Sequence, residues 1–362
     1  MSANFFNSSY LKAQEQFLAD AKASGARLES IPIGGPELKG PQGEPLSIDV
    51  AIWGPKVGPT LILSSGLHGI EGYCGSGIQL AAMQHQFPED LRRVFIHAIN
   101  PYGMAHLRRV NENNVDLNRN FIFDPAGFEG CSDGYHKLNT LLNPPRPFQG
   151  TEPLMFIKTL WTIVKHGMPA LKQAVASGQY AYPQGLFFGG HELEEGPTKL
   201  IQKLDDWLTG CGPMVHIDFH TGLGEFGDYA LLLEATADSK LYREMHAAFG
   251  EKIQPWQAGE GVAYSISGGF PAAMQAQFKE QTRVLTCEFG TYPPRKVIEA
   301  MTAENRAHFF GGRVGQAKEA FKEIFYPQSE AWQNQIVSKG LFVVDQALSF
   351  LKDRARETQE LR

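Results

Sequence analysis

The feature that most constrains the fold is a series of short apolar runs that alternate with stretches of helical periodicity. Runs rich in β-branched and aromatic residues predict strands. They are RLESIPI (27–33), LSIDVAIW (46–53), TLILSS (60–65), VFIHAIN (94–100), MVHIDFH (214–220), YALLLEA (229–235) and RVLTCEF (283–289). Apolar residues at helical spacing predict helices between and around them. These are a helix from about residue 9, then 75–87, 153–178, 239–253, 302–325 and 329–357, the last broken near Gly340. The alternation predicts an α/β fold with a mixed, mostly parallel central sheet flanked by helices.

The chain of 362 residues is expected to form a single domain, 1–362. No internal repeat or low-complexity linker divides it. A segment rich in Gly, Pro and Asn follows residue 124, and we interpret the loop-rich and helical stretch at about 124–210 as an excursion from this domain. The helical tail after about 329 has one apolar face, which predicts packing on the body or on a partner chain, so an oligomer is possible.

Composition narrows the class of protein. The net charge of −6 and the absence of long basic runs argue against nucleic acid and anionic membranes as partners. No apolar window approaches the ~20 residues of a membrane span, and the first 25 residues lack the pattern of a signal peptide. Four scattered cysteines contain no CxxC pair, so neither a disulfide framework nor a cysteine zinc cluster is predicted. We therefore expect a cytoplasmic protein.

Four polar stretches stand at the ends of predicted strands. They are HGIE (68–71), the loop NPYGMAHLRRVNENNVDLNRNF (100–121), HIDFHTGLGEFGD (216–228) and TCEFGTYPP (286–294). In an open α/β sheet the carboxyl ends of several strands meet at one crevice. Residues far apart in the sequence are therefore expected to share one site.

The residue types in these stretches match a catalytic zinc site. Two imidazoles and one carboxylate leave a fourth position for water, and His68, Glu71 and His220 supply that set. The zinc-activated water would attack a carbonyl, with Glu288 as general base. Arg109 would hold the oxyanion that develops.

The remaining polar residues suggest how substrate and ligands are held. Asn118 and Arg119 would bind a substrate carboxylate, since the guanidinium group offers two parallel hydrogen bonds. Either Asp116 or Asp218 would hold a ligand imidazole through its second ring nitrogen, as zinc-bound histidines usually require. Both candidates stay open at this stage.

Together, HGIE, DLNRNF, DFHTG and CEFGT, in this order from about 60 to 290, resemble the zinc metallocarboxypeptidase superfamily. That superfamily includes the succinylglutamate desuccinylase/aspartoacylase branch, and SSGLHGIEGYCGSG is most similar to a poorly characterised bacterial group. The resemblance implies a metal at the strand ends and the same residue roles as above. It also points to Tyr264, which lies near the place of the peptidases' substrate-closing tyrosine.

Several competing interpretations remain. His191 and Glu194 repeat the HxxE spacing in LFFGGHELEEGP, but the acidic run reads more simply as a helix start. His216 lies on the same strand face as His220, and we interpret it as a core histidine. Only one of Arg108 and Arg109 needs to face the site. Cys74 lies at a helix start but lacks a matching base, so a small buried residue is favoured over a nucleophile.

The leading hypothesis is a hydrolase with one zinc ion per chain that cleaves an amide bond next to a substrate carboxylate. The substrate would be a peptide, as for a carboxypeptidase, or an N-acyl amino acid. The alternative is a binding protein that captures a small carboxylate without hydrolysis. A serine hydrolase is disfavoured because no GxSxG motif is present.

Overall fold

The computed structural model describes residues 5–150, 177–255 and 268–360. Its centre is an eight-stranded sheet in the order β1-β2-β4-β3-β5-β8-β6-β7. The strands are β1 (Arg27–Pro32), β2 (Ser47–Trp53), β3 (Thr60–Ser65), β4 (Arg92–His97), β5 (Met214–Gly222), β6 (Tyr229–Leu233), β7 (Ile253–Pro255) and β8 (Thr282–Gly290). The four neighbours β4, β3, β5 and β8 run parallel, and antiparallel pairings lie on either side of them. The predicted mixed, mostly parallel sheet is confirmed, and so is each of the seven predicted strands.

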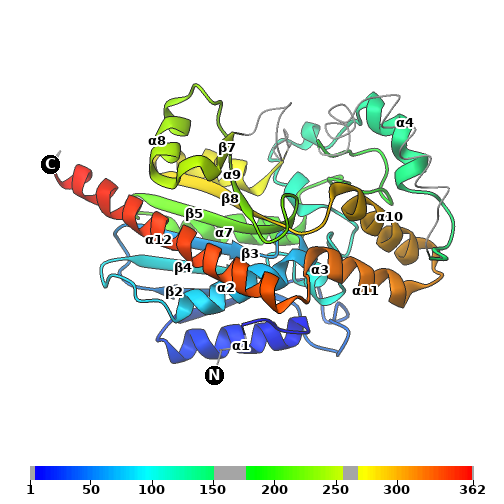
Figure 1. Ribbon diagram of the computed structural model, residues 1–362, viewed down its shortest axis with the longest axis horizontal. Helices are drawn as coiled ribbons and strands as arrows, with labels where there is room; N and C mark the ends of the chain where they lie inside the picture. The colour runs from blue at the N-terminus through cyan, green and yellow to red at the C-terminus, as the bar shows by residue number, and fades with distance from the viewer. Residues whose placement is uncertain (1–4, 151–176, 256–267, 361–362) are drawn as a thin grey trace.

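Helices cover both faces of this sheet (Figure 1). They are α1 (Tyr10–Ala23), α2 (Gly72–Met83), α3 (Pro101–Ala105), α4 (Asp133–Leu142), α7 (Glu195–Leu208), α8 (Lys240–Phe249), α9 (Phe270–Phe278), α10 (Pro294–Phe310), α11 (Val314–Phe325) and α12 (Glu330–Glu360). Helices α1, α2 and α12 pack on one face, and α7 and α9 pack on the other. The chain therefore forms three layers, with the sheet buried between two layers of helix.

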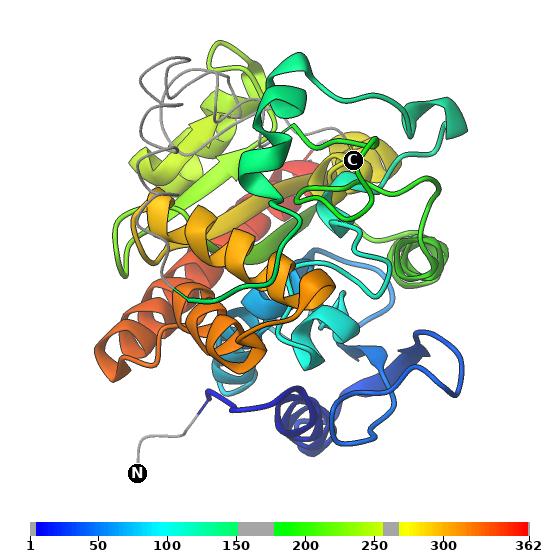
Figure 2. The same ribbon diagram turned by 90° about the vertical axis from the view of Figure 1, so that its right-hand side faces the viewer.

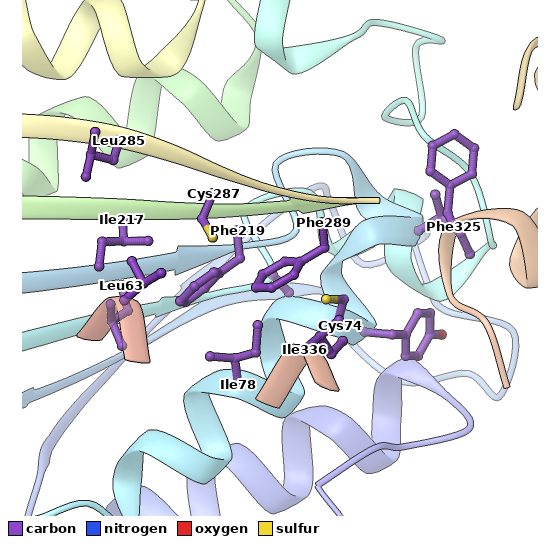
Figure 3. Close-up of a cluster of buried hydrophobic side chains, with 14 of the residues drawn as sticks. Leu63, Cys74, Ile78, Ile217, Phe219, Leu285, Cys287, Phe289, Phe325 and Ile336 are labelled. Atoms are coloured by element: carbon purple, nitrogen blue, oxygen red, sulfur yellow. The ribbon is translucent and has the colours of Figure 1, made fainter. Parts of the chain in front are cut away.

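Strand β3 shows why the sequences of the central strands are continuous apolar runs. Leu61 and Leu63 point to the α2 and α12 side, whereas Ile62 points to the α7 and α9 side. Across the sheet, Leu63, Ile217 and Leu285 form one row on the first side. Figure 3 shows this row above Ile78 of α2 and Ile336 of α12. Both sides of the strand are thus buried, as expected for parallel strands between helical layers.

The C-terminal tail is one helix, α12, so the predicted break near Gly340 is wrong. A Cβ atom at position 340 would lie only 2.7 Å from Cγ2 of Ile78. This glycine therefore lets α12 approach α2 closely and does not interrupt the helix. The tail packs on the body of its own chain, one of the two possibilities that its apolar face predicted.

One other helix prediction changes, and one is not tested. The stretch 302–325 belongs to two helices, α10 and α11, because Gly311 and Gly312 adopt φ of 74° and 97° and end the first one. Figures 1 and 2 show these helices side by side at one end of the molecule. The predicted helix over 153–178 lies almost wholly outside the described residues. Among the described helices, none is both long and apolar enough to cross a membrane.

Candidate metal centre

The segment after β3 is shaped by a close backbone approach. A Cβ atom at Gly69 would lie 2.1 Å from the carbonyl carbon of Gly103, so only glycine fits there. The N–H groups of Gly69 and Ile70 donate to the carbonyl oxygens of Arg109 and Arg108, at 3.0 and 2.9 Å. These two bonds fix the HGIE segment against the arginine loop and explain why glycine follows the histidine.

Three side chains converge at the carboxyl ends of β3 and β5. The Nδ1 atom of His68 lies 3.0 Å from Oε1 of Glu71, and Nδ1 of His220 lies 3.0 Å from Oε2 of the same carboxylate. The two Nδ1 atoms are 3.2 Å apart. All three residues are buried, and no other group of at least three metal-ligating residues gathers in this way in the part of the chain that the structure describes.

Each histidine is backed by an aspartate on its other ring nitrogen. His68 Nε2 lies 3.1 Å from Asp116 Oδ1, and His220 Nε2 lies 2.8 Å from Asp218 Oδ2. The sequence left open which of the two aspartates would hold a ligand imidazole. In the structure both do, because Asp116 contacts His68 and Asp218 contacts His220. The Nε2 atoms thus face the aspartates, and the Nδ1 atoms face the Glu71 carboxylate, where a metal ion would be held.

A second layer of support was missed by the sequence analysis. The Ser64 hydroxyl donates to Asp218 Oδ1 at 2.6 Å, and it lies 2.6 Å from Nε2 of His216. Ser64 and Asp218 are paired in the register of β3 and β5. His216 is fully buried, and burial lowers the pKa of its imidazole to about 4, as for a neutral core histidine. The sequence signal was a serine that ends the apolar run TLILSS.

The electrostatics of the cluster keep its carboxylates ionised. Burial alone would raise the pKa of Glu71, but His68 and His220 outweigh it and bring this pKa below its usual range. For Asp116, burial is likewise outweighed by Arg119, Arg109 and His68, so its pKa also lies well below its usual value. Both carboxylates are therefore charged at neutral pH, although they are buried.

Arg109 lies directly beside the three converging side chains. Its Nη1 donates to Glu71 Oε1 at 2.9 Å, and its Nε donates to Asp116 Oδ2 at 3.1 Å. Its Nη2 lies 2.6 Å from His68 Nε2. The neighbouring Arg108 points elsewhere and pairs with Glu304, so one arginine of the two faces the cluster.

Glu288 lies next to His220, because the two are register partners in the parallel strands β5 and β8. Its Oε1 accepts a hydrogen bond from the backbone N–H of Leu223 at 2.9 Å. Burial raises the pKa of this carboxyl to about 7, and the negative charge of Glu71 acts in the same direction. A carboxyl group in this state exchanges a proton readily near neutral pH.

The residues predicted to bind substrate have different surroundings. Asn118 accepts a hydrogen bond from the N–H of Phe270 at 3.1 Å. Arg119 is fully buried, and its Nη1 lies 3.5 Å from Asp116 Oδ2. Tyr264 lies outside the described residues. The structure thus brings Asn118 and Arg119 next to the cluster, with Asp116 as the link.

The competing candidates lie elsewhere. His191 is exposed, and the Glu194 carboxylate accepts hydrogen bonds at 2.7 Å from the side chains of Asn111 and Asn113. Cys74 is buried, and burial raises the pKa of its thiol well above the usual value. A buried neutral thiol matches the small core residue that the sequence favoured.

Two imidazole nitrogens and one carboxylate, each imidazole backed by an aspartate, form a donor set that suits a divalent metal ion. This site lies at the strand ends of an α/β fold. The chain belongs to the family described as Protein of unknown function (DUF2817), whose model matches residues 6–339. No curated protein matches the sequence.

Solved structures with a similar fold include two hydrolases. Carboxypeptidase A from Helicoverpa armigera is 14% identical, with 88% of this chain and 74% of that chain covered and a TM-score of 0.47. Murein-tripeptide amidase MpaA from Escherichia coli O157 is 15% identical, with 86% and 97% covered and a TM-score of 0.37. The ectoine utilization protein EutE (DoeB) from Ruegeria pomeroyi is 15% identical, with 77% and 64% covered and a TM-score of 0.38.

A carboxypeptidase and an amidase are among these neighbours. Because the identities and TM-scores are low, the function proposed below rests on this chain's own side chains.

Proposed function

We propose that the protein is a zinc-dependent hydrolase of amide bonds, with one ion held by His68, Glu71 and His220. The observation that carries this proposal is the convergence of three buried ligand atoms within 4.8 Å of one another. The two aspartates behind the histidines add to it, because they fix the tautomer that a metal requires. A bound zinc ion supplies a water of lowered pKa and polarises the substrate carbonyl.

Glu288 would take the proton from the attacking water and deliver it to the leaving amine. Its position beside His220 and its raised pKa suit a group that accepts and returns one proton near pH 7. The hydrogen bond from the Leu223 N–H holds one carboxylate oxygen, so the other oxygen is available for the exchange.

Arg109 would stabilise the oxyanion. Its Nη1 and Nη2 contact Glu71 and His68, which would hold the ion. We infer that these two nitrogens would turn toward the substrate when Glu71 and His68 are engaged as ligands. The Nε contact with Asp116 stays as the anchor.

The substrate would carry a carboxylate that Asn118 and Arg119 bind next to the scissile bond. Peptides and N-acyl amino acids both meet this requirement. Asp116 connects the two functions, since it contacts His68 on one side and Arg119 on the other.

The test is a panel of peptides and N-acyl amino acids, screened for amine release by the zinc-loaded wild type and by Glu288→Gln. Hydrolysis by the wild type, with turnover lost and zinc retained in Glu288→Gln, supports the proposal. Normal turnover in Glu288→Gln contradicts the mechanism. Binding without hydrolysis across the panel would instead favour a carboxylate-binding protein.

A further inference from the structure

A small cavity adjoins the metal centre on the side of Arg109. Both Arg108 and Arg109 line it, together with Asn114 of the same loop and with Phe187 and Glu304 from two other segments of the chain. The proposed hydrolysis uses Arg109, but the other residues that line this cavity have no role in it. We call it the Arg108 cavity.

Arg108 has one donor group that its neighbours leave unused. It is 1% exposed, its Nε donates to Glu304 Oε1 at 3.0 Å, and its Nη2 donates to Asn114 Oδ1 at 2.9 Å. Its buried Nη1 has no hydrogen-bond partner among the residues that the structure describes. An unpaired buried donor on a charged group is costly, so such a group calls for a ligand or a water.

The charges around Arg108 favour an anion over a cation. Glu304 Oε1 accepts from both Arg108 and Lys318, at 3.0 and 2.7 Å, so two cations share one carboxylate. Lys318 is also held by the carbonyl oxygens of His106 and Leu107. The group of three charged side chains therefore keeps one net positive charge next to the cavity.

The backbone around the cavity is held in uncommon conformations. Leu107 and Asn114, on either side of the two arginines, have φ of +53° and +61°, and Phe187 has φ of +59°. Non-glycine residues with positive φ are uncommon and gather at functional sites. The Phe187 ring lies 5.8 Å from the guanidinium carbon of Arg109 and 5.7 Å from that of Arg119. This ring thus connects the cavity wall to both arginines of the proposed site.

We propose that the Arg108 cavity is a subsite for a second carboxylate of the substrate, which accepts a hydrogen bond from Arg108 Nη1. The inference rests on the proposed function, because the subsite acts next to the carbonyl that Arg109 would hold. Arg108 is then a residue that determines specificity, and the substrate carries an anionic group in addition to the one assigned to Arg119.

The test uses dicarboxylates as probes, with malonate, succinate and glutarate each compared with its own monoamide. Each pair has the same length and differs by one negative charge. Calorimetric titration of the zinc-loaded wild type is expected to show a preference of about tenfold or more for the best dicarboxylate over its monoamide. Zinc per chain is measured in the same samples.

Two variants at position 108 locate the effect. Arg108→Gln removes the charge while Lys318 still pairs with Glu304, and it is expected to bring the ratio near one. Arg108→Lys keeps the charge but lacks the planar guanidinium group, so it is expected to lose most of the preference for the dicarboxylate. This variant replaces Arg108→Gln in the test if the Gln variant does not fold. Arg92→Lys is the matched control, because Arg92 is also buried but bonds to the carbonyls of Trp207 and Pro55.

The outcomes separate the two proposals. No preference in a zinc-loaded wild type, or an unchanged preference in both Arg108 variants, overturns the subsite and leaves the hydrolase standing. A wild type that binds no zinc overturns the proposed function, and the subsite with it. A preference lost at position 108 and kept in Arg92→Lys supports the subsite.

Discussion

The chain contains two HxxE segments that occupy different environments in the fold. His68 and Glu71 are buried, and their side chains meet His220 at the sheet edge. In the second segment, His191 is exposed and Glu194 is the N-cap residue of helix α7. Both segments follow an apolar run, and only the acidic run around Glu194 distinguishes them locally.

The difference lies in what the rest of the fold brings to each segment. His68 follows β3, between β4 and β5, where the chain order reverses in the sheet and crevices form. Asp116 and the end of β5 reach this point from elsewhere in the sequence. The Glu194 carboxylate instead accepts hydrogen bonds from the neutral amides of Asn111 and Asn113. A spacing is therefore a metal site only where other strands end beside it.

The largest expected effect concerns metal content. His68→Ala is expected to abolish the zinc of the wild type, about one ion per chain, because two of three protein ligands do not hold it. His191→Ala is expected to keep it. Elemental analysis after dialysis measures both. Equal zinc loss in the two variants would remove the distinction between the segments.

The next effect concerns turnover. Glu288→Gln is expected to lower kcat by about 10²–10⁴-fold with zinc retained, since a general base contributes this much. Glu194→Gln, in the second segment, is expected to keep its kcat. Steady-state kinetics on a substrate found in the panel provides the values. A fall of similar size in Glu194→Gln would place that segment in the active site.

A smaller effect is expected from the residues behind the ligands. Asp116→Asn and Asp218→Asn should each weaken zinc binding by about 10–100-fold, because the imidazoles lose their orienting carboxylates. Asn113→Ala, which removes one of the two amide hydrogen bonds to Glu194, serves as the control. Competition with a chelator of known affinity measures the constants, and unchanged affinity in both aspartate variants would contradict the role given to the carboxylates.

Zinc should also stabilise the folded state. At a free zinc concentration about 100 times the Kd, the free energy of unfolding should rise by about 2.7 kcal/mol. The rise is expected in the wild type and in His191→Ala but not in His68→Ala. Thermal unfolding with zinc and with chelator tests this, and a zinc-induced rise in the Tm of His68→Ala would show that other residues bind the ion.

His97 lies outside both segments and affects the pH dependence of stability rather than metal content. Burial lowers the pKa of His97 to about 3, and Ser76 is its hydrogen-bond neighbour. The unfolded state has a pKa near 6.5, so it binds more protons between about pH 6.5 and 3, and stability falls as the pH decreases through this range. The slope is about 1.4 kcal/mol per pH unit. In zinc-free protein, the free energy of unfolding is measured with denaturant at several pH values. Its slope against pH should be shallower for His97→Gln than for the wild type. An equal slope would assign the pH dependence to other groups.

Much of the fold is predictable from the sequence because the central strands are buried on both sides. Their apolar runs are short, end at polar residues and alternate with helical stretches, so the layered α/β architecture follows. The errors in the helix predictions occur at glycines, because a glycine either ends a helix or allows close packing within one. Gly340 allows α12 to pack on Ile78 within one helix, whereas Gly311 ends α10, and only the neighbouring elements distinguish these cases.

The sequence by itself determined the residue types of the site and the strand ends at which they stand. Parallel strands place their carboxyl ends at one edge, so His68, Glu71, His220 and Glu288 could be assigned to a common place. Tertiary structure alone decided that Asp116 and Asp218 each hold one imidazole, that Ser64 supports Asp218, and that Arg108 turns toward Glu304. These choices depend on register between strands and on packing across the chain, which no local pattern encodes.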